Sequence, residues 1–264
     1  MIPVERLQSH LRGSAKQRYE SQPVPPFTVF IHPTDDLTYF NYAIPDEPIA
    51  ERPDPLPDEL ARPLCSLIEA FGARGRAPRF EYLREYAPGL GASLARAGFA
   101  REAHQQFMVC MPLDARLAPD VPGLAIEILD RGATLEQARV FLGTQRKGFD
   151  PENEVEIDAD EAARWLGEIG NETLLLARLG REPVGAGMLM SPVDGIVELA
   201  GLATLLPYRQ RGVASAMASH ALRTAFARGL EAVCLTAENE RAGRIYARVG
   251  FRPAATACAW IKRS

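Results

Sequence analysis

The 264-residue sequence has few cysteines and lacks a long hydrophobic run. Its four cysteines are far apart and form no Cys-x-x-Cys pair, which argues against a zinc site and a disulfide framework. No run approaches the roughly 18 apolar residues that a membrane span requires. Glu5, Arg6 and Arg12 occupy the region where a signal peptide would be apolar. We therefore expect a cytoplasmic protein that contacts no membrane.

Concentrated charge of one sign is also absent. The formal net charge is −4, and Lys and Arg are spread along the chain without a basic block. A nucleic-acid-binding surface needs a basic patch on one face, so we expect no nucleic-acid partner. The four histidines do not cluster, and the sequence contains neither a metal-ligand spacing nor a Gly-x-Ser-x-Gly elbow. We expect no metal.

The length favours two domains, because single domains cluster near 100–150 residues. Residues 111–123 contain three prolines and no sustained hydrophobic period, which is typical of a linker. We predict one domain over residues 1–117 and a second over residues 118–264. A Pro-rich stretch at 45–63 predicts a long loop within the first domain.

After the linker, the hydrophobic pattern alternates between strands and helices. Thr134 with Gln137 three residues later predicts a capping box at the start of a helix. The predicted strands span 124–129, 173–178, 183–190, 197–206, 232–236 and 251–262. The predicted helices span 134–146, 158–169, 213–228 and 239–249, and Gly229 and Gly250 end the last two.

The first half carries a faded copy of the last part of the chain. Residues 94–99 (LARAGF) align with residues 246–251 (YARVGF), an offset of 152 because 246 − 94 = 152. Upstream, residues 80–83 take the place of the strand predicted at 232–235. A short Ala-Arg-x-Gly-Phe match can arise from common helix-end chemistry, but its flanking apolar runs favour an internal duplication.

The most informative stretch is residues 206–214 (LPYRQRGVA), between a predicted strand and a long helix. The amides at a helix N-terminus have no partner within the helix, so they attract phosphate. Gly212 and the small Ala214 would let the backbone approach an anion, while Arg209 and Arg211 add positive charge. Alone, the pattern fits equally well a basic turn that caps a helix.

In this context the sequence resembles the GNAT superfamily of acyl-CoA N-acyltransferases. The resemblance covers about the last 70 residues well and the preceding 70 by element order. One departure is that Leu206 stands where the family usually has proline, and Pro207 follows. The matching residues are Glu198, Ala203, Thr204, Arg209, Gly212, Ala214, Asn239, Ala242, Tyr246, Gly250 and Phe251.

The resemblance implies an α/β fold of two GNAT-like units, each with a mixed, mostly antiparallel sheet flanked by helices. It also implies direct acetyl transfer from acetyl-CoA to a primary amine of a small molecule or peptide, by a monomer or homodimer without a metal. The implied coenzyme-binding residues are Ala203, Thr204, Leu205, Arg209, Gln210, Arg211, Gly212, Val213, Ala214 and Asn239.

Two side chains are candidates for catalysis under this resemblance. Glu198 would act as the base for the amine, although it could equally be an exposed strand residue. Tyr246 would protonate the departing thiolate, and it could also pack in the core. Backbone amides near Thr204 and Leu205 would bind the oxyanion. Asn239 would contact the pantetheine arm, although capping the helix would explain it alone.

The first half resembles a second, degenerate unit of the same family over about residues 24–112. Where its phosphate loop should lie, residues 54–59 (DPLPDE) bring acidic groups and prolines that oppose an anion. We therefore expect this half to bind no coenzyme.

Two alternatives to an acetyl-CoA-dependent transferase remain. One is a non-catalytic acyl-CoA-binding sensor or partner-binding module, and the other is a transferase that uses aminoacyl-tRNA as its donor. The charge and the intact loop disfavour the latter.

Overall fold

The computed structural model describes residues 2–51, 59–152 and 156–263, and the chain divides into two units. One unit joins Met1–Phe107 with Pro253–Ser264, and the other is Met108–Arg252. This division corrects the predicted boundary at 117/118. The last strand of the chain belongs to the first unit because its ladder partner, Arg79–Leu83, lies there.

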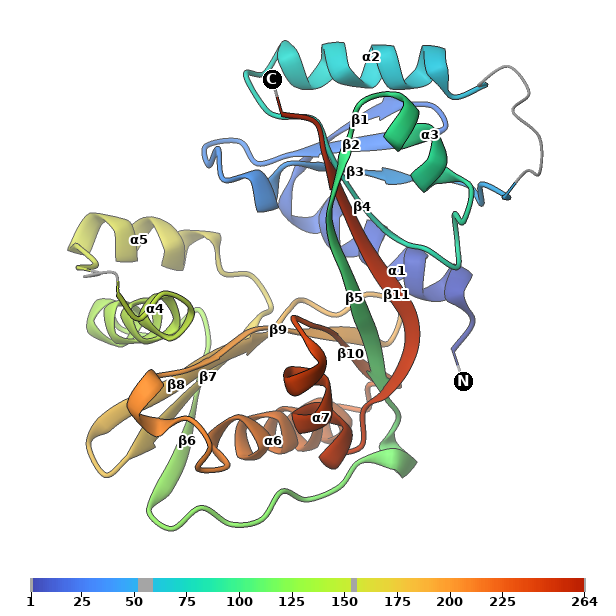
Figure 1. Cartoon of the computed structure of the whole chain (residues 1–264). Coiled ribbons are helices and arrows are strands. Elements are labelled where there is room, and N and C mark those ends of the chain that lie inside the picture. Colours follow the sequence, from blue (N-terminus) through green and yellow to red (C-terminus); the bar gives the residue numbers. More distant parts are fainter. Residues whose placement is uncertain (1, 52–58, 153–155, 264) are drawn as a thin grey trace. The chain divides into compact units, whose positions relative to one another are not determined.

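The described residues of the first unit form a mixed sheet and the helices α1, α2 and α3 (Figure 1). Its sheet order is β1-β2-β3-β4-β11-β5, with β3 parallel and β11 antiparallel to β4. Helix α2 contacts β1 and β2, and α1 contacts β4. The elements are α1 (Val4–Arg18), β1 (Glu20–Val24), β2 (Phe27–Ile31), β3 (Tyr42–Pro45), α2 (Ala61–Gly72), β4 (Arg79–Leu83), α3 (Leu90–Arg96), β5 (Ala100–Cys110) and β11 (Arg252–Ile261), with a 3₁₀ helix at Thr38–Phe40.

The second unit has the sheet order β6-β7-β8-β9-β10, antiparallel except for the parallel pair β9 and β10. Its elements are β6 (Leu124–Leu129), α4 (Leu135–Phe149), α5 (Ala159–Glu168), β7 (Thr173–Leu179), β8 (Glu182–Leu189), β9 (Ile196–Thr204), α6 (Val213–Ala227), β10 (Ala232–Ala237) and α7 (Glu240–Arg248), with 3₁₀ helices at Pro112–Asp114 and Leu206–Tyr208.

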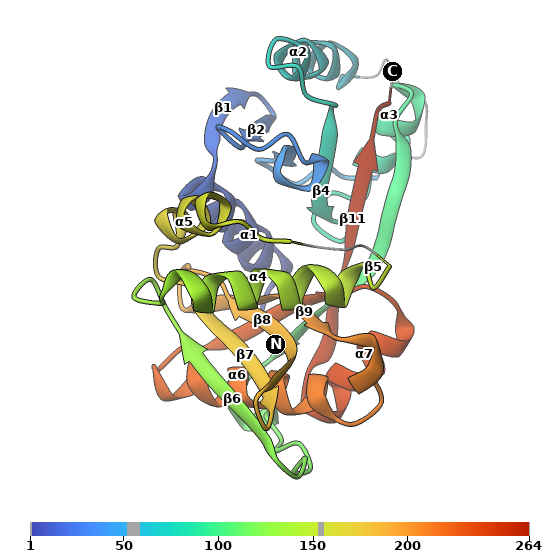
Figure 2. The ribbon, with the colours of Figure 1, turned by 90° about the vertical axis from the view of Figure 1, so that its left-hand side faces the viewer.

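Strand alternation divides the core of the second unit between two faces of the sheet. Leu174 and Leu176 of β7 pack with Phe141 on the α4 side, while Leu175 and Ala177 pack with the α6 side. Figure 2 shows α4 and α6 on opposite sides of these strands. This burial on both faces explains the continuous apolar run of β7.

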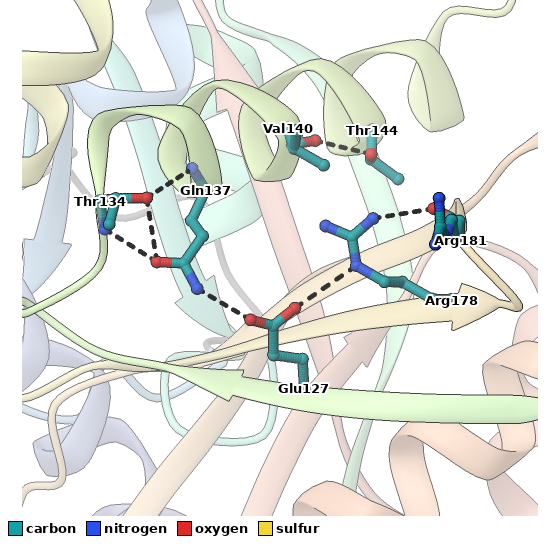
Figure 3. Close-up of polar contacts among 7 residues, drawn as sticks. All are labelled: Glu127, Thr134, Gln137, Val140, Thr144, Arg178 and Arg181. Carbon is teal, nitrogen blue, oxygen red and sulfur yellow. Dashed lines mark hydrogen bonds and ion pairs between the residues drawn. The ribbon is translucent and has the colours of Figure 1, made fainter.

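The start of α4 confirms the predicted capping box. The Thr134 hydroxyl accepts from the Gln137 amide at 3.2 Å, and the Gln137 side-chain oxygen accepts from the Thr134 amide at 2.9 Å. Gln137 also donates to the Glu127 carboxylate at 2.8 Å (Figure 3). The Arg178 guanidinium reaches the other oxygen of Glu127 at 3.4 Å. The cap thus ties α4 to strands β6 and β7.

The offset of 152 residues also relates the first residues of two pairs of elements. Helices α2 and α6 begin at Ala61 and Val213, and 213 − 61 = 152. Strands β5 and β11 begin at Ala100 and Arg252, and 252 − 100 = 152. The structure therefore repeats a unit in which a strand, a helix, a parallel strand, a helix and a final strand follow one another. Strand β11 ends the second repeat in sequence yet completes the sheet of the first unit.

The predicted linker packs along α6 and α7 within the second unit. Arg116 donates its amide to the Val249 carbonyl at 3.0 Å, and Ala118 donates its amide to the Ser219 hydroxyl at 3.2 Å. Farther on, Val121 lies beside Gly212, just before α6. The segment is therefore packed against α6.

Among the described residues, no helix has both the length and the apolar character that crossing a membrane requires.

Deleting residues 253–264 should destabilise the first unit, because β4 and β5 would lose the strand between them. Both strands would then expose unpaired backbone edges, and the buried side chains of Phe80 and Leu83 would become accessible to solvent. Hydrogen exchange of the peptide containing residues 79–83 should become much faster. A chain lacking only residues 263 and 264 is the matched control, and unchanged exchange of β4 after the longer deletion would contradict the assignment.

Candidate functional site

The central feature of the second unit is a fork between two parallel strands. Strand β9 pairs with β10 at Ile196–Ala232, Val197–Val233 and Glu198–Cys234. Beyond that point β9 continues to Thr204 and β10 to Ala237, but no further pair joins them. We call residues 199–204 the open arm, since β8 borders it on one edge and the fork on the other.

A β-bulge lies within the open arm. The register between β8 and β9 shifts between Ala186 and Met188, so Gly187 faces two residues of the arm. Gly201 has a φ of 59°, in the left-handed region that favours glycine. A bulge turns the strand and re-aims its neighbours. Residues 200–202 consequently line the space opened by the fork.

A cavity of about 570 Å³ occupies the fork. It lies within the second unit and is bordered by the open arm, the start of α6, the end of β10, one face of α7 and the end of α4. Every sequence-predicted site residue except Leu205 and Arg211 lines it. These lining residues are Glu198, Ala203, Thr204, Arg209, Gln210, Gly212, Val213, Ala214, Asn239 and Tyr246.

The loop before α6 is shaped by two residues of positive φ, Gln210 at 66° and Gly212 at 85°. Gly212 is the N-cap of α6 and provides no side-chain cap, so the amides of the first turn remain directed at the cavity. The first turn contains no acidic residue. With 15 residues, α6 has an N-terminal dipole that favours an anion here.

The two arginines of this loop make contacts within the protein. Arg209 donates from Nε to the Thr204 carbonyl at 3.1 Å and from Nη2 to the Gly148 carbonyl at 2.6 Å. Arg211 lies over the Tyr208 ring at 5.4 Å from its centroid and does not line the cavity. Both positive charges remain near the loop, but the hydrogen bonds of Arg209 go to the protein backbone.

The prediction of Leu205 as an oxyanion donor is wrong for this structure. Its amide donates to the Val184 carbonyl of β8 at 2.9 Å, and the residue does not line the cavity. Because neighbouring residues of a strand point to opposite edges, the amide of Thr204 lies on the edge away from β8. The predicted strand also extended to 206, whereas β9 ends at Thr204 before a 3₁₀ turn.

Glu198 stands where the pairing between β9 and β10 ends, opposite Cys234. Its half-buried side chain lines the cavity, which places it inside the fork and not on an open surface. Burial raises the pKa of the Cys234 thiol, and the nearby Glu198 carboxylate raises it further. Two acidic residues, Glu198 and Glu238, line the cavity. Glu198 lies at the last pair between β9 and β10, whereas Glu238 follows the end of β10, so Glu198 is the one nearer the base of the fork.

Tyr246 serves both the core and the cavity wall. Its ring packs edge-on against Phe251, with centroids 5.9 Å apart, and the residue also lines the cavity. Burial and then the charge of Glu238 raise the pKa of the Tyr246 phenol to about 12. A raised pKa keeps the phenol protonated at neutral pH. The hydroxyl is thus a hydrogen-bond donor.

Asn239 has a local structural duty. Its side-chain oxygen accepts from the Ala242 amide at 3.0 Å and caps α7. The cap directs one end of the side chain into the helix, while the residue still borders the cavity. The amide nitrogen is the part of the side chain that could donate to a ligand.

Several cavity residues escaped the sequence-based prediction. They come from the end of α4, the bulge and the polar face of α7, and they are Gly148, Phe149, Ala200, Gly201, Leu202, Glu238, Arg241 and Arg248. An isolated glycine in an apolar strand indicates a bulge, so Gly201 carried a signal. The contributions of α4 depend on long-range packing and had none.

The first repeat lacks the corresponding geometry in its described part. At the position matching Gly212, the N-cap of α2 is Leu60 with a φ of −87°, where Gly212 has 85°. Strand β3 has four residues, whereas β9 has nine. Residues 54–58 of the acidic segment described above lie outside the described residues.

In the described ranges, no group of three or more His, Cys, Asp or Glu residues could hold a metal ion.

Comparison with known proteins gives a consistent picture. Residues 141–251 match the model of the Acetyltransferase (GNAT) family. A GCN5-related N-acetyltransferase from Kribbella flavida has a TM-score of 0.80 and 22% identity, covering 100% of this chain and 97% of that one. One from Sphaerobacter thermophilus has a TM-score of 0.60 and 14% identity, covering 90% and 78%.

A tandem GNAT protein from the clavulanic acid biosynthesis pathway has a TM-score of 0.59 and 14% identity, covering 89% of this chain and 78% of that one. At these identities, the structural likeness shows that the fold is shared. The search of curated proteins gave no match.

Proposed function

From the membership of residues 141–251 in the GNAT family, we propose that the chain is an N-acetyltransferase. It would move an acetyl group from acetyl-CoA to a primary amine of a small molecule or peptide. The observation that carries this proposal is the forked cavity, into which an uncapped helix N-terminus, Glu198 and Tyr246 all face.

The coenzyme would bind by its diphosphate at the first turn of α6. The amides of Val213, Ala214 and Ser215 have no carbonyl partner inside the helix, and Gly212 lets the anion come close. The pantetheine would run along the open arm, whose edge toward β10 has no strand partner. This arrangement brings the thioester toward Glu198.

The amine needs a base before it can attack. An alkylammonium has a pKa of about 10.4, so it is mostly protonated at neutral pH. Glu198 would accept this proton directly or through one water, at the closed end of the fork. The amine nitrogen then bonds to the thioester carbon and releases its second proton, and the carbon–sulfur bond breaks as the tetrahedral intermediate collapses. One of the two protons goes to the thiolate, and the other leaves to solvent.

Tyr246 would serve the leaving group as a hydrogen-bond donor. With its pKa raised to about 12, the phenol is a weaker acid than a thiol, whose ordinary pKa is about 8.5. Complete proton transfer to a free thiolate is therefore unfavourable. Hydrogen bonding to the developing charge still stabilises it, and the proton taken from the amine can neutralise the thiolate afterwards.

Calorimetric titration of acetyl-CoA should give a defined binding isotherm with the wild type and none with Gly212→Glu. The substitution places a carboxylate at the anion site. Gly229→Glu is the matched control, since Gly229 also has a positive φ of 77° but follows the opposite end of α6. Loss of binding in both variants would indicate general damage. Absence of wild-type binding would overturn the proposal.

Glu198→Gln should retain acetyl-CoA binding while lowering kcat/KM by about 10²–10⁴-fold, the usual contribution of a general base. Thiol release would be followed across a panel of small amines and peptides. Glu168→Gln, on the exposed end of α5, is the control. Undiminished turnover by Glu198→Gln would remove Glu198 from the mechanism. Coenzyme binding without thiol release by the wild type would favour the acyl-CoA-binding module.

Tyr246→Phe should lower kcat by about 10-fold or more without changing the shape of the pH–rate profile between pH 6 and pH 10. The sign follows from the raised pKa: a phenol with a pKa of about 12 stays protonated below that pH, so its ionisation adds no alkaline limb. An alkaline limb below pH 10 that disappears in Tyr246→Phe would contradict this environment.

A further inference from the structure

The last two turns of α4 hold the open arm of β9 through a polar contact at the bulge. Gln145 donates from Nε2 to the Gly201 carbonyl at 2.9 Å. The bulge glycine makes this approach possible, because a Cβ on Gly201 would lie only 2.4 Å from the Gln145 nitrogen. The contact therefore depends on both residues.

A second contact lies at the far end of the arm. Arg209 bridges the Thr204 carbonyl, where the arm ends, and the Gly148 carbonyl, in the last turn of α4. Gly148 is packed closely against the arm, since a Cβ there would lie 2.7 Å from the Ala203 Cβ. Helix and arm thus meet over the whole stretch from Gly201 to Thr204.

These contacts have a mechanical consequence for the arm. Strand β8 binds one edge of residues 199–204, and the fork leaves the other edge without a strand. A carbonyl on an unpaired edge competes for any donor that enters the cavity. Gln145 and Arg209 engage the carbonyls of Gly201 and Thr204, so these two acceptors are already bonded within the protein.

We propose that Gln145 and Arg209 are positioning residues that brace the open arm against α4 and thereby place the acyl-bearing end of the coenzyme. This inference rests on the proposed function and deepens it. It assigns Arg209 to the arm and not to the diphosphate. It also makes the end of α4, which borders the cavity at Gly148 and Phe149, part of the transferase machinery.

The test separates the two halves of the coenzyme. Titrations with acetyl-CoA report the arm and the loop together, while adenosine 3′-phosphate 5′-diphosphate, the nucleotide half, reports the loop. The variants are Gln145→Leu and Arg209→Met, each of which removes the donors but keeps an apolar chain. Lys147→Met is the control, because Lys147 is exposed on the same turns of α4 and does not line the cavity.

Gln145→Leu and Arg209→Met should each weaken acetyl-CoA binding by about 10-fold, the order of effect expected when one or two partly exposed hydrogen bonds that hold the arm are lost. Binding of the nucleotide half should stay within about two-fold of the wild type. Hydrogen exchange of residues 199–204 should become faster in both variants and remain unchanged in Lys147→Met.

Each alternative result is distinct. Equal weakening of both ligands by Arg209→Met would make it a phosphate ligand, and unchanged acetyl-CoA binding by both variants would remove the brace. Either outcome overturns the inference while the proposed function stands. Failure of the wild type to bind acetyl-CoA would overturn both.

Discussion

The parting of β9 and β10 after Glu198 and Cys234 is the constraint on which the site depends. Two parallel strands that continue without pairing leave backbone groups that need other partners. The protein supplies some of them, from Gln145 and Arg209, and the remaining groups face a cavity of about 570 Å³. The same parting brings Glu198, at its base, into one space with Tyr246 of α7. If β9 and β10 stayed paired beyond Glu198 and Cys234, the space between them would be closed.

The two repeats show what this constraint requires. Their elements follow one another at offsets close to 152 residues, yet among the described residues only the second repeat combines a long arm with a left-handed N-cap. Leu60 cannot adopt the φ of Gly212 without strain, because its Cβ would approach the following carbonyl. The four-residue β3 provides no arm of comparable length. The described part of the first repeat therefore keeps the packing of the fold without the geometry of the site.

The sequence was most informative where structure is local. The capping box at Thr134, the helix beginning at Val213 and the strand 124–129 follow from neighbouring residues, and the structure confirms them. The position of β11 in the sheet of the first unit could not be predicted from the sequence. The two repeats have similar strand patterns, and a hydrophobic pattern does not determine which strand a segment pairs with. The bulge at Gly201 was not predicted, and its register is a property of the pairing between β8 and β9. The bond from Arg209 to the Gly148 carbonyl also had no signal in the sequence, because the two residues are 61 positions apart.

The backbone at the start of α6 adds a positive end to a cavity that the side chains of Arg209, Arg241 and Arg248 also line. Arg209 is bonded to two carbonyls and Arg211 lies over Tyr208, so neither guanidinium is directed solely at a ligand. The amides at the start of α6 are oriented by the helix itself and by the left-handed turn at Gly212. Backbone amides form a rigid set of donors, whereas a lysine or arginine side chain must lose rotamer freedom to bind. Under the proposed function, the geometry of this loop therefore contributes to binding of the diphosphate in addition to the basic residues that line the cavity.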